Sequence, residues 1–223
     1  MAQTWYDLLF AHWPVSADDL RRIVPRSLAI DTFQGQPWLA VTPFGMRGVR
    51  LRGLPSLPGV SAFPELNVRS YVTLDGVPGV YFFSLDAGSR LAVAVARRWY
   101  ALPYHHAHMS MRPAGDWIVY TSRRADGRAE FRARYRPAGP AFEAAAGSLE
   151  AWLTERYCLY TTKAGRTYRA DIDHVPWALR PAEAEIEVNT MAAAAGIRLP
   201  SIPPRLHFAG RQDVVAWAPR RAR

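Results

Sequence analysis

Cysteine is almost absent from this 223-residue chain, where Cys158 is the single example. One cysteine excludes a disulfide within the chain and is typical of a reducing compartment, so we expect a cytoplasmic protein. No run approaches the roughly 18 consecutive apolar residues that a membrane-spanning helix needs, so we expect no membrane partner. The first residues, MAQTWYDLLFAHWP, lack the basic start and the cleavage site of a secretion signal.

Lysine is equally rare. Among 28 Lys and Arg residues only Lys163 is a lysine, which leaves 27 arginines and a net charge of +9. This skew indicates a bias in overall composition more than a surface selected to bind nucleic acid. The arginines are scattered and become dense only in RRADGRAEFRARYR and in the tail APRRAR. A solvated basic surface is the simpler interpretation, which disfavours nucleic acid as the partner.

Familiar catalytic and cofactor motifs are also missing. The chain has no GxSxG elbow, no glycine-rich loop for phosphate, no dinucleotide fingerprint and no HExxH pair. We therefore predict no cofactor. The lone Cys158, between Tyr157 and Leu159, is interpreted as a small core residue and not as a nucleophile. The polar and aromatic segments TERYCLYT and DIDHVPW are interpreted as a helix end and a strand end.

What the chain does have is enough apolar residue for a core and many short periodic segments. Hydrophobic residues make up 49% and charged residues 21%, and no composition boundary divides the chain, so we expect one domain over residues 1–223. Ser16 begins a helix that Pro25 stops. Further helices are expected at 89–102, 148–157 and 189–197. Strands are expected at 36–44, 65–74, 80–86, 104–111, 116–124, 128–136, 158–162, 166–177, 177–188 and 205–219.

This pattern predicts a mainly β fold with peripheral helices (α+β), either an antiparallel barrel or a sandwich. The clearest strand is 128–136, where the arginines and Glu130 share one face while Phe131 and Tyr135 share the other. The segment 45–64 is too long for a plain connector, and we interpret it as a lid or edge of a site.

The segment LPYHHAHM concentrates three histidines within four positions. On a strand, His106 and His108 point to one side and His105 to the other. A metal would need a third ligand from His12, His174, His207 or a carboxylate. Histidines hydrogen-bonded to their neighbours are the simpler interpretation, and we predict no metal site.

Glu65 is the carboxylate most suited to chemistry. It follows Phe63 and Pro64 at the start of an apolar strand, with Arg69 four positions further and on the same face. Burial among aromatic residues raises the pKa of a carboxyl, and a facing arginine lowers it again. The pair can serve a general acid or base, or it can form a partly buried ion pair, and both interpretations stay open.

Several motifs, in order along the chain, resemble those of the YqjF-like family of uncharacterised bacterial proteins. They are WYDLLFAHWPV, LRRIVP, FPELNVRSYV, PGVYFFSLDAGS, LPYHHAHM, ERYCLYT and HVPW. That family is similar to the acetoacetate decarboxylases, so the resemblance implies an antiparallel β-barrel, or curved double sheet, around a central cavity. There, a strand glutamate faces a Pro-Lys-Lys segment, and one of the lysines forms a Schiff base.

The resemblance matches Glu65 to the strand glutamate and retains Pro103, but Tyr104 and His105 occupy the two lysine positions. A Schiff-base mechanism is therefore not expected, because Lys163 lies far along the chain in a TTKAGR turn. The matched segment instead places Tyr104, His105 and His106 as candidates for the cavity wall.

Three functions follow from these observations. The first is an enzyme, lyase-like or isomerase-like, that moves a proton on a carbonyl or carboxylate compound. Glu65 would be its acid or base, with Tyr104, His105 and His106 as further catalytic candidates. The residues assigned to substrate binding are Arg69, for a carboxylate, together with Tyr71, Phe83 and Arg97.

The second function is a non-catalytic module that binds an apolar or aromatic acid in the same cavity. The third is nucleic-acid binding through the arginine strand. The expected partner is a small organic acid, and the eight tryptophans make a homodimer plausible.

Overall fold

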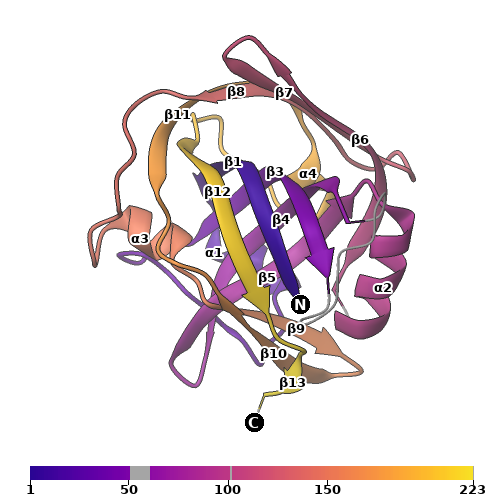
Figure 1. Ribbon diagram of the computed structural model, residues 1–223. Coiled ribbons are helices and arrows are strands. Elements are labelled where there is room, and N and C mark those ends of the chain that lie inside the picture. Colours follow the sequence, from indigo (N-terminus) through magenta and orange to yellow (C-terminus); the bar gives the residue numbers. More distant parts are fainter. Residues whose placement is uncertain (51–60, 101, 223) are drawn as a thin grey trace.

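Period-two segments dominate the chain, and the computed structural model, which describes residues 1–50, 61–100 and 102–222, forms strands from most of them (Figure 1). Within these residues thirteen strands make one sheet. They are β1 (Ala2–Pro14), β2 (Ala29–Ile30), β3 (Trp38–Arg50), β4 (Phe63–Leu74), β5 (Val77–Ala87), β6 (Tyr104–Ala114), β7 (Trp117–Arg124), β8 (Glu130–Pro137), β9 (Cys158–Lys163), β10 (Arg166–Asp173), β11 (Leu179–Asn189), β12 (Arg205–Ala216) and β13 (Arg220–Arg221).

Short helices connect these strands. They are α1 (Ala17–Ile23), α2 (Arg90–Tyr100), α3 (Leu149–Thr154) and α4 (Met191–Ala194). Ser16 caps α1 by accepting a hydrogen bond from the backbone N–H of Asp19, as its sequence predicts. In Figure 1, α2 and α3 lie at opposite sides of the strands. No helix in the described part of the chain combines the length and the apolar character that crossing a membrane requires.

The strand pairings close on themselves. In the order β4, β5, β9, β10, β12, β1, β3, each strand pairs with the next, and β3 pairs again with β4. A second ring shares β12, β1, β3, β4 and β5 and is completed by β6, β7, β8 and β11. The five shared strands therefore have an interior on each face.

Two pairings differ from the expected antiparallel sheet. Strand β5 runs parallel to both β6 and β9. Parallel neighbours need a crossover connection, and α2 provides it between β5 and β6. The interior of the second ring, called here the larger core, is filled by apolar side chains, including the fully buried Tyr120, Phe131 and Tyr135.

The arginine strand has the predicted alternation. On β8, Phe131 and Tyr135 are fully buried, while the arginines between them face outward. Each of three arginines meets a glutamate of the neighbouring β11, in the pairs Arg132–Glu187 (3.3 Å), Arg134–Glu185 (2.7 Å) and Arg136–Glu183 (2.7 Å). The positive charge of this row is thus largely compensated within the sheet.

Two features depart from the sequence expectations. Strand β1 was not foreseen, although its register pairs it with β3 and with β12. The connection expected at 45–64 is shorter, because β3 continues to Arg50 and β4 begins at Phe63. Of the rest of that expected lid, residues 51–60 lie outside the described residues.

Candidate functional site

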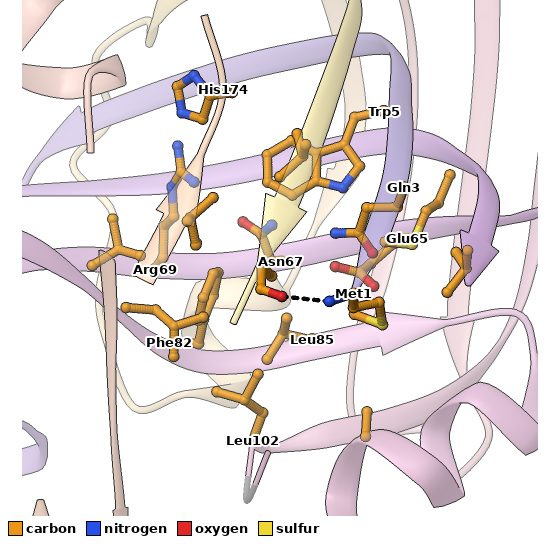
Figure 2. A pocket seen from close by; sticks show the side chains of 18 of the residues that line it. Met1, Gln3, Trp5, Glu65, Asn67, Arg69, Phe82, Leu85, Leu102 and His174 are labelled. Carbon is orange, nitrogen blue, oxygen red and sulfur yellow. Dashed lines mark hydrogen bonds between the residues drawn. The ribbon is translucent and has the colours of Figure 1, made fainter. Parts of the chain in front are cut away.

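The interior of the first ring holds a pocket of about 140 Å³ (Figure 2), called here the Glu65 pocket. Its floor and walls come from β1, β3, β4, β5, β9, β10 and β12, with α2 and the ends of α3 and β6 at its edge. Most of its surface is apolar. The large apolar side chains that line it include Trp5, Met46, Phe63, Phe82, Leu85, Leu102 and Trp177.

The polar side chains of the pocket follow one strand. Glu65, Asn67 and Arg69 occupy alternate positions of β4, so all three point into the pocket while Leu66 and Val68 point into the larger core. Figure 2 shows Asn67 between the other two. The expectation that Glu65 and Arg69 share a face is confirmed, but the ion pairs of the described residues include none between them.

Glu65 is buried, with 3% of its surface exposed. Burial raises the pKa of this carboxyl to about 8; a hydrogen bond from Tyr104 opposes the change and the charge of Asp86 adds to it. A group with this pKa is about nine-tenths protonated at pH 7. Glu65 is therefore a carboxylic acid in the resting pocket, ready to donate a proton.

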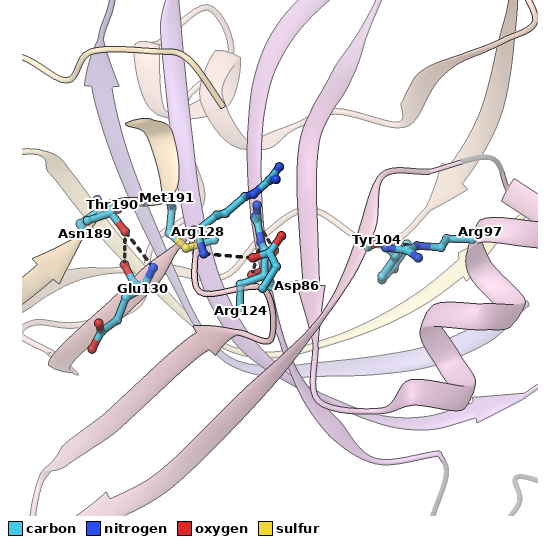
Figure 3. A network of polar contacts seen from close by, with 10 residues as sticks. Asp86, Arg97, Tyr104, Arg124, Arg128, Glu130, Asn189, Thr190 and Met191 are labelled. Atoms are coloured by element: carbon cyan, nitrogen blue, oxygen red, sulfur yellow. Dashed lines mark hydrogen bonds and ion pairs between the residues drawn. The ribbon is translucent and has the colours of Figure 1, made fainter. Parts of the chain in front are cut away.

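Tyr104 holds the Glu65 side chain in place. Its hydroxyl donates to Oε2 of Glu65 at 2.9 Å. Leu85 of β5 pairs with Tyr104 in register, and Arg97 of α2 donates to the carbonyl of Tyr104 at 2.6 Å (Figure 3). From the larger core, the Tyr120 hydroxyl donates to the backbone carbonyl of Glu65 at 2.7 Å. The carboxyl is thus fixed through both its side chain and its backbone.

Arg69 is a buried cation with no carboxylate beside it among the described residues. Its side chain lies over the ring of Phe10, at 5.5 Å from the centroid, and 8% of the residue is exposed. Burial lowers the pKa of this guanidinium, and the neighbouring Tyr71 counteracts the effect. Its Nε has no hydrogen-bond partner in the described structure.

Arg156 brings a second guanidinium to the pocket. Its Nη1 bonds to Asp31 at 2.6 Å, and its planar group lies over the rings of Tyr71 (4.9 Å) and Trp152 (4.4 Å). Nη2 of Arg156 has no partner among the described residues. Two cations with unpaired N–H groups therefore face one small pocket, which favours an anion.

The remaining predicted site residues lie outside the lining of the pocket. Tyr71 is fully buried beneath it, where its hydroxyl donates to the carbonyl of Leu153 at 2.8 Å. Phe83 points to the other face of β5, because a bulge shifts the register there and brings Phe82 inward instead. Arg97 is exposed and donates a hydrogen bond to the backbone carbonyl of Tyr104.

The histidine segment divides at Tyr104. Of Tyr104, His105 and His106, only Tyr104 lines the pocket in the described structure. His105 lies in the field of the buried Asp86–Arg124 pair, and burial, followed by Arg124, lowers its pKa. The ring of His106 contacts that of His108, with centroids 5.4 Å apart.

A metal site has no support in the described residues. They contain no group of three or more His, Cys, Asp or Glu side chains placed to hold a metal ion. Of the other histidines that the sequence offered as ligands, His12 and His207 lie on the paired strands β1 and β12, within electrostatic reach of each other. His12 is fully buried on β1, His174 lines the pocket beside Trp177, and His207 lies on β12. Burial lowers the pKa of His12 and of His207.

Sequence reasoning missed several residues of the pocket. Asn67 was within reach of the period-two argument that selected Glu65 and Arg69. Gln3 and Trp5 were missed because β1 was not foreseen. Arg156 and Trp177 were interpreted as parts of a helix end and a strand end, and only the folded chain brings them to β4.

Comparison with known proteins shows the family of this chain. Residues 2–213 match DUF2071, a family of uncharacterized conserved proteins. The chain belongs to this family. It is similar to the uncharacterized protein YqjF of Bacillus subtilis (strain 168), with 53% identity over 218 residues that cover 97% of this chain and 90% of that protein.

Solved structures share the fold. An acetoacetate decarboxylase from Legionella pneumophila superimposes with a TM-score of 0.68 at 12% identity, covering 100% of this chain and 88% of that one. The enduracididine biosynthesis enzyme MppR, complexed with pyruvate, gives 0.68 at 10% identity, with 99% and 89% covered. An acetoacetate decarboxylase-like enzyme from Sphingomonas wittichii RW1 gives 0.67 at 11%, with 100% and 92% covered. At such identities the likeness concerns the fold alone.

Proposed function

We propose that the first ring is a small barrel whose Glu65 pocket binds a small organic carboxylate and moves a proton on it. The observation that carries this proposal is Arg69, a buried cation that faces the pocket without a carboxylate partner among the described residues. An unpaired buried charge is costly, and the carboxylate of a ligand would compensate it through a bidentate pair.

The size of the pocket limits the ligand. A cavity of about 150 Å³ accommodates a molecule such as benzene, and the Glu65 pocket measures about 140 Å³. With the carboxylate at Arg69, the short apolar remainder of such an acid would lie against Phe82, Leu85 and Trp177. This arrangement suits an acid of roughly six to ten non-hydrogen atoms.

Glu65 is the group that would move the proton. In its ionised form, which is accessible near its pKa of about 8, it can remove the proton from the carbon next to the carbonyl of a bound keto acid, which gives an enolate. The carboxyl, now protonated, can then give this proton to the enolate oxygen, which gives the enol. If Glu65 exchanges its proton with solvent, the reverse sequence returns the keto acid with a hydrogen taken from solvent.

No lysine is available for a Schiff base. The one lysine of the chain, Lys163, ends β9 on an exposed position away from the pocket. The positions that the resemblance matches to lysines hold Tyr104 and His105. The proposed reaction is therefore enolisation without an imine, supported by the Glu65–Tyr104 hydrogen bond.

The test is hydrogen exchange at the carbon next to the carbonyl. We expect the protein to catalyse the loss of the C3 proton signal of 2-oxoisovalerate in D₂O, followed by ¹H NMR, and Glu65→Gln to lose this activity. Glu187→Gln, which removes an exposed carboxylate of β11, serves as the matched control and retains it. Exchange at the same rate in Glu65→Gln would contradict the role of Glu65.

A non-catalytic binding module is the second candidate. It is favoured by the predominantly apolar walls of the pocket, since a binder needs only such walls and one anchor. Binding of the acid without any exchange above the uncatalysed rate would select this candidate over the enzyme.

A further inference from the structure

The order of polar side chains along β4 indicates which functional groups a ligand of the pocket carries. Asn67 lies two residues after Glu65 and two residues before Arg69, so successive side chains start roughly 6.6 Å apart on the same face. The pocket therefore meets its ligand with a carboxyl group, an amide and a guanidinium in that order (Figure 2). Asn67 is the polar group next to the carboxylate anchor.

Asn67 itself has a buried side-chain atom that lacks a hydrogen bond. It is 5% exposed, and its Oδ1 has no hydrogen-bond partner in the described structure. The same holds for Oε1 of Gln3, which is 8% exposed and also lines the pocket. An amide oxygen accepts hydrogen bonds and cannot donate them. Leaving such an oxygen unpaired in an occupied, dry pocket costs free energy.

The unpaired polar groups of the pocket thus include both hydrogen-bond donors and hydrogen-bond acceptors. Trp5 Nε1, Arg69 Nε and Arg156 Nη2 are donors without partners in the described residues, and the amide oxygens of Gln3 and Asn67 are acceptors without partners. A carboxylate has only acceptor atoms, so it can satisfy the donors alone. A second group on the ligand, one that carries a hydrogen, can satisfy the amide oxygens.

Resting on the proposed function, we propose that the ligand carries a hydroxyl on the carbon next to its carboxylate and that this hydroxyl donates to Oδ1 of Asn67. Two compounds share this chemistry: a 2-hydroxy acid and the enol form of a 2-keto acid. The keto form has no O–H and leaves Asn67 unpaired. Asn67 therefore favours the enol over the ketone, which is the differential binding that accelerates enolisation.

The test compares three acids with one carbon skeleton: isovalerate, 2-hydroxyisovalerate and 2-oxoisovalerate. Their affinities are measured by isothermal titration calorimetry at fixed pH and salt. For the wild type we expect 2-hydroxyisovalerate to bind about tenfold more tightly than either of the others, the typical effect of one buried hydrogen bond. In Asn67→Leu, which keeps the branched shape of the side chain and removes the acceptor, the three acids bind within about twofold of one another.

Two controls accompany this comparison. Asn189→Leu makes the same substitution on β11, away from the pocket, and preserves the wild-type preference. Circular dichroism and a thermal melt establish that each variant is folded, and Asn67→Ala replaces Asn67→Leu if the leucine variant does not fold.

The outcomes separate the inference from the function on which it rests. Equal affinity of the wild type for all three acids, or tightest binding of the keto acid, overturns the role of Asn67 while leaving a carboxylate site intact. A wild type that binds none of the acids, or an Arg69→Met variant that binds them all as tightly as the wild type, overturns the proposed function and with it the inference.

Discussion

The burial of Glu65 makes the stability of the protein depend on pH. The folded state holds the Glu65 proton up to a pKa of about 8, whereas an ordinary glutamate releases it near 4.5. The stability associated with this proton is complete below pH 4.5 and is lost as the pH rises through 8. At about 1.4 kcal/mol per pH unit, the whole effect is about 5 kcal/mol.

Glu65→Gln removes this dependence, because the amide has no proton to release and still accepts a hydrogen bond from Tyr104. Between pH 5 and pH 9, we expect the wild type to lose about 4 kcal/mol of unfolding free energy relative to Glu65→Gln. Urea unfolding followed by tryptophan fluorescence, at intervals of one pH unit, measures the difference. Domain stabilities are about 5–15 kcal/mol, so the effect is large.

The control for the lost charge is Glu187→Gln, an exposed carboxylate with 70% of its side chain accessible. Its difference from the wild type should stay within about 0.5 kcal/mol across the range. If the wild type and Glu65→Gln differ by a constant amount between pH 5 and pH 9, Glu65 does not hold its proton at neutral pH and the reasoning is refuted.

Three further predictions concern the neighbours of Glu65. Tyr104→Phe removes a hydrogen bond that lowers the pKa of Glu65, so a ¹³C NMR titration of that carboxyl should give a still higher value; a lower value would contradict this. Asp86→Asn leaves the buried Arg124 without its carboxylate and should destabilise the fold by about 3–5 kcal/mol in urea unfolding, whereas a loss below about 1 kcal/mol would oppose it. Arg69→Met removes an unpaired buried cation, so Tm should rise by roughly 2–4 °C; a fall would show that an unseen partner stabilises the cation.

Much of the fold follows from local patterns. Ser16, Asp18 and Asp19 predict α1, and the alternation around Phe131 predicts β8, because capping and period two are properties of neighbouring residues. The family resemblance, carried by motifs spread along the chain, predicted the family that the comparisons show.

The sequence predictions failed where the period-two alternation of a strand is interrupted or where the contacting residues are distant in sequence. In β1, Asp7 adopts a positive φ of 49° and the register shifts after Tyr6, so the alternation that would reveal a strand is broken. The same effect in β5 moved Phe83 away from the pocket that it was expected to line.

The candidate site was anticipated only in part for the same reasons. Glu65 and Arg69 share one strand, so period two was enough to bring them together. Arg156 lies 87 residues beyond Arg69, and its place in the pocket depends on the packing of α3 against Tyr71. No local pattern contains that information.

The most direct test of a carboxylate site at Arg69 is a thermal-shift titration of the wild type, Arg69→Met and Glu187→Gln with 2-hydroxyisovalerate. A ligand that binds only the folded state raises Tm by mass action. We predict that Tm rises with acid concentration in the wild type and in Glu187→Gln and stays constant in Arg69→Met. An equal rise in Arg69→Met would contradict a carboxylate site at Arg69.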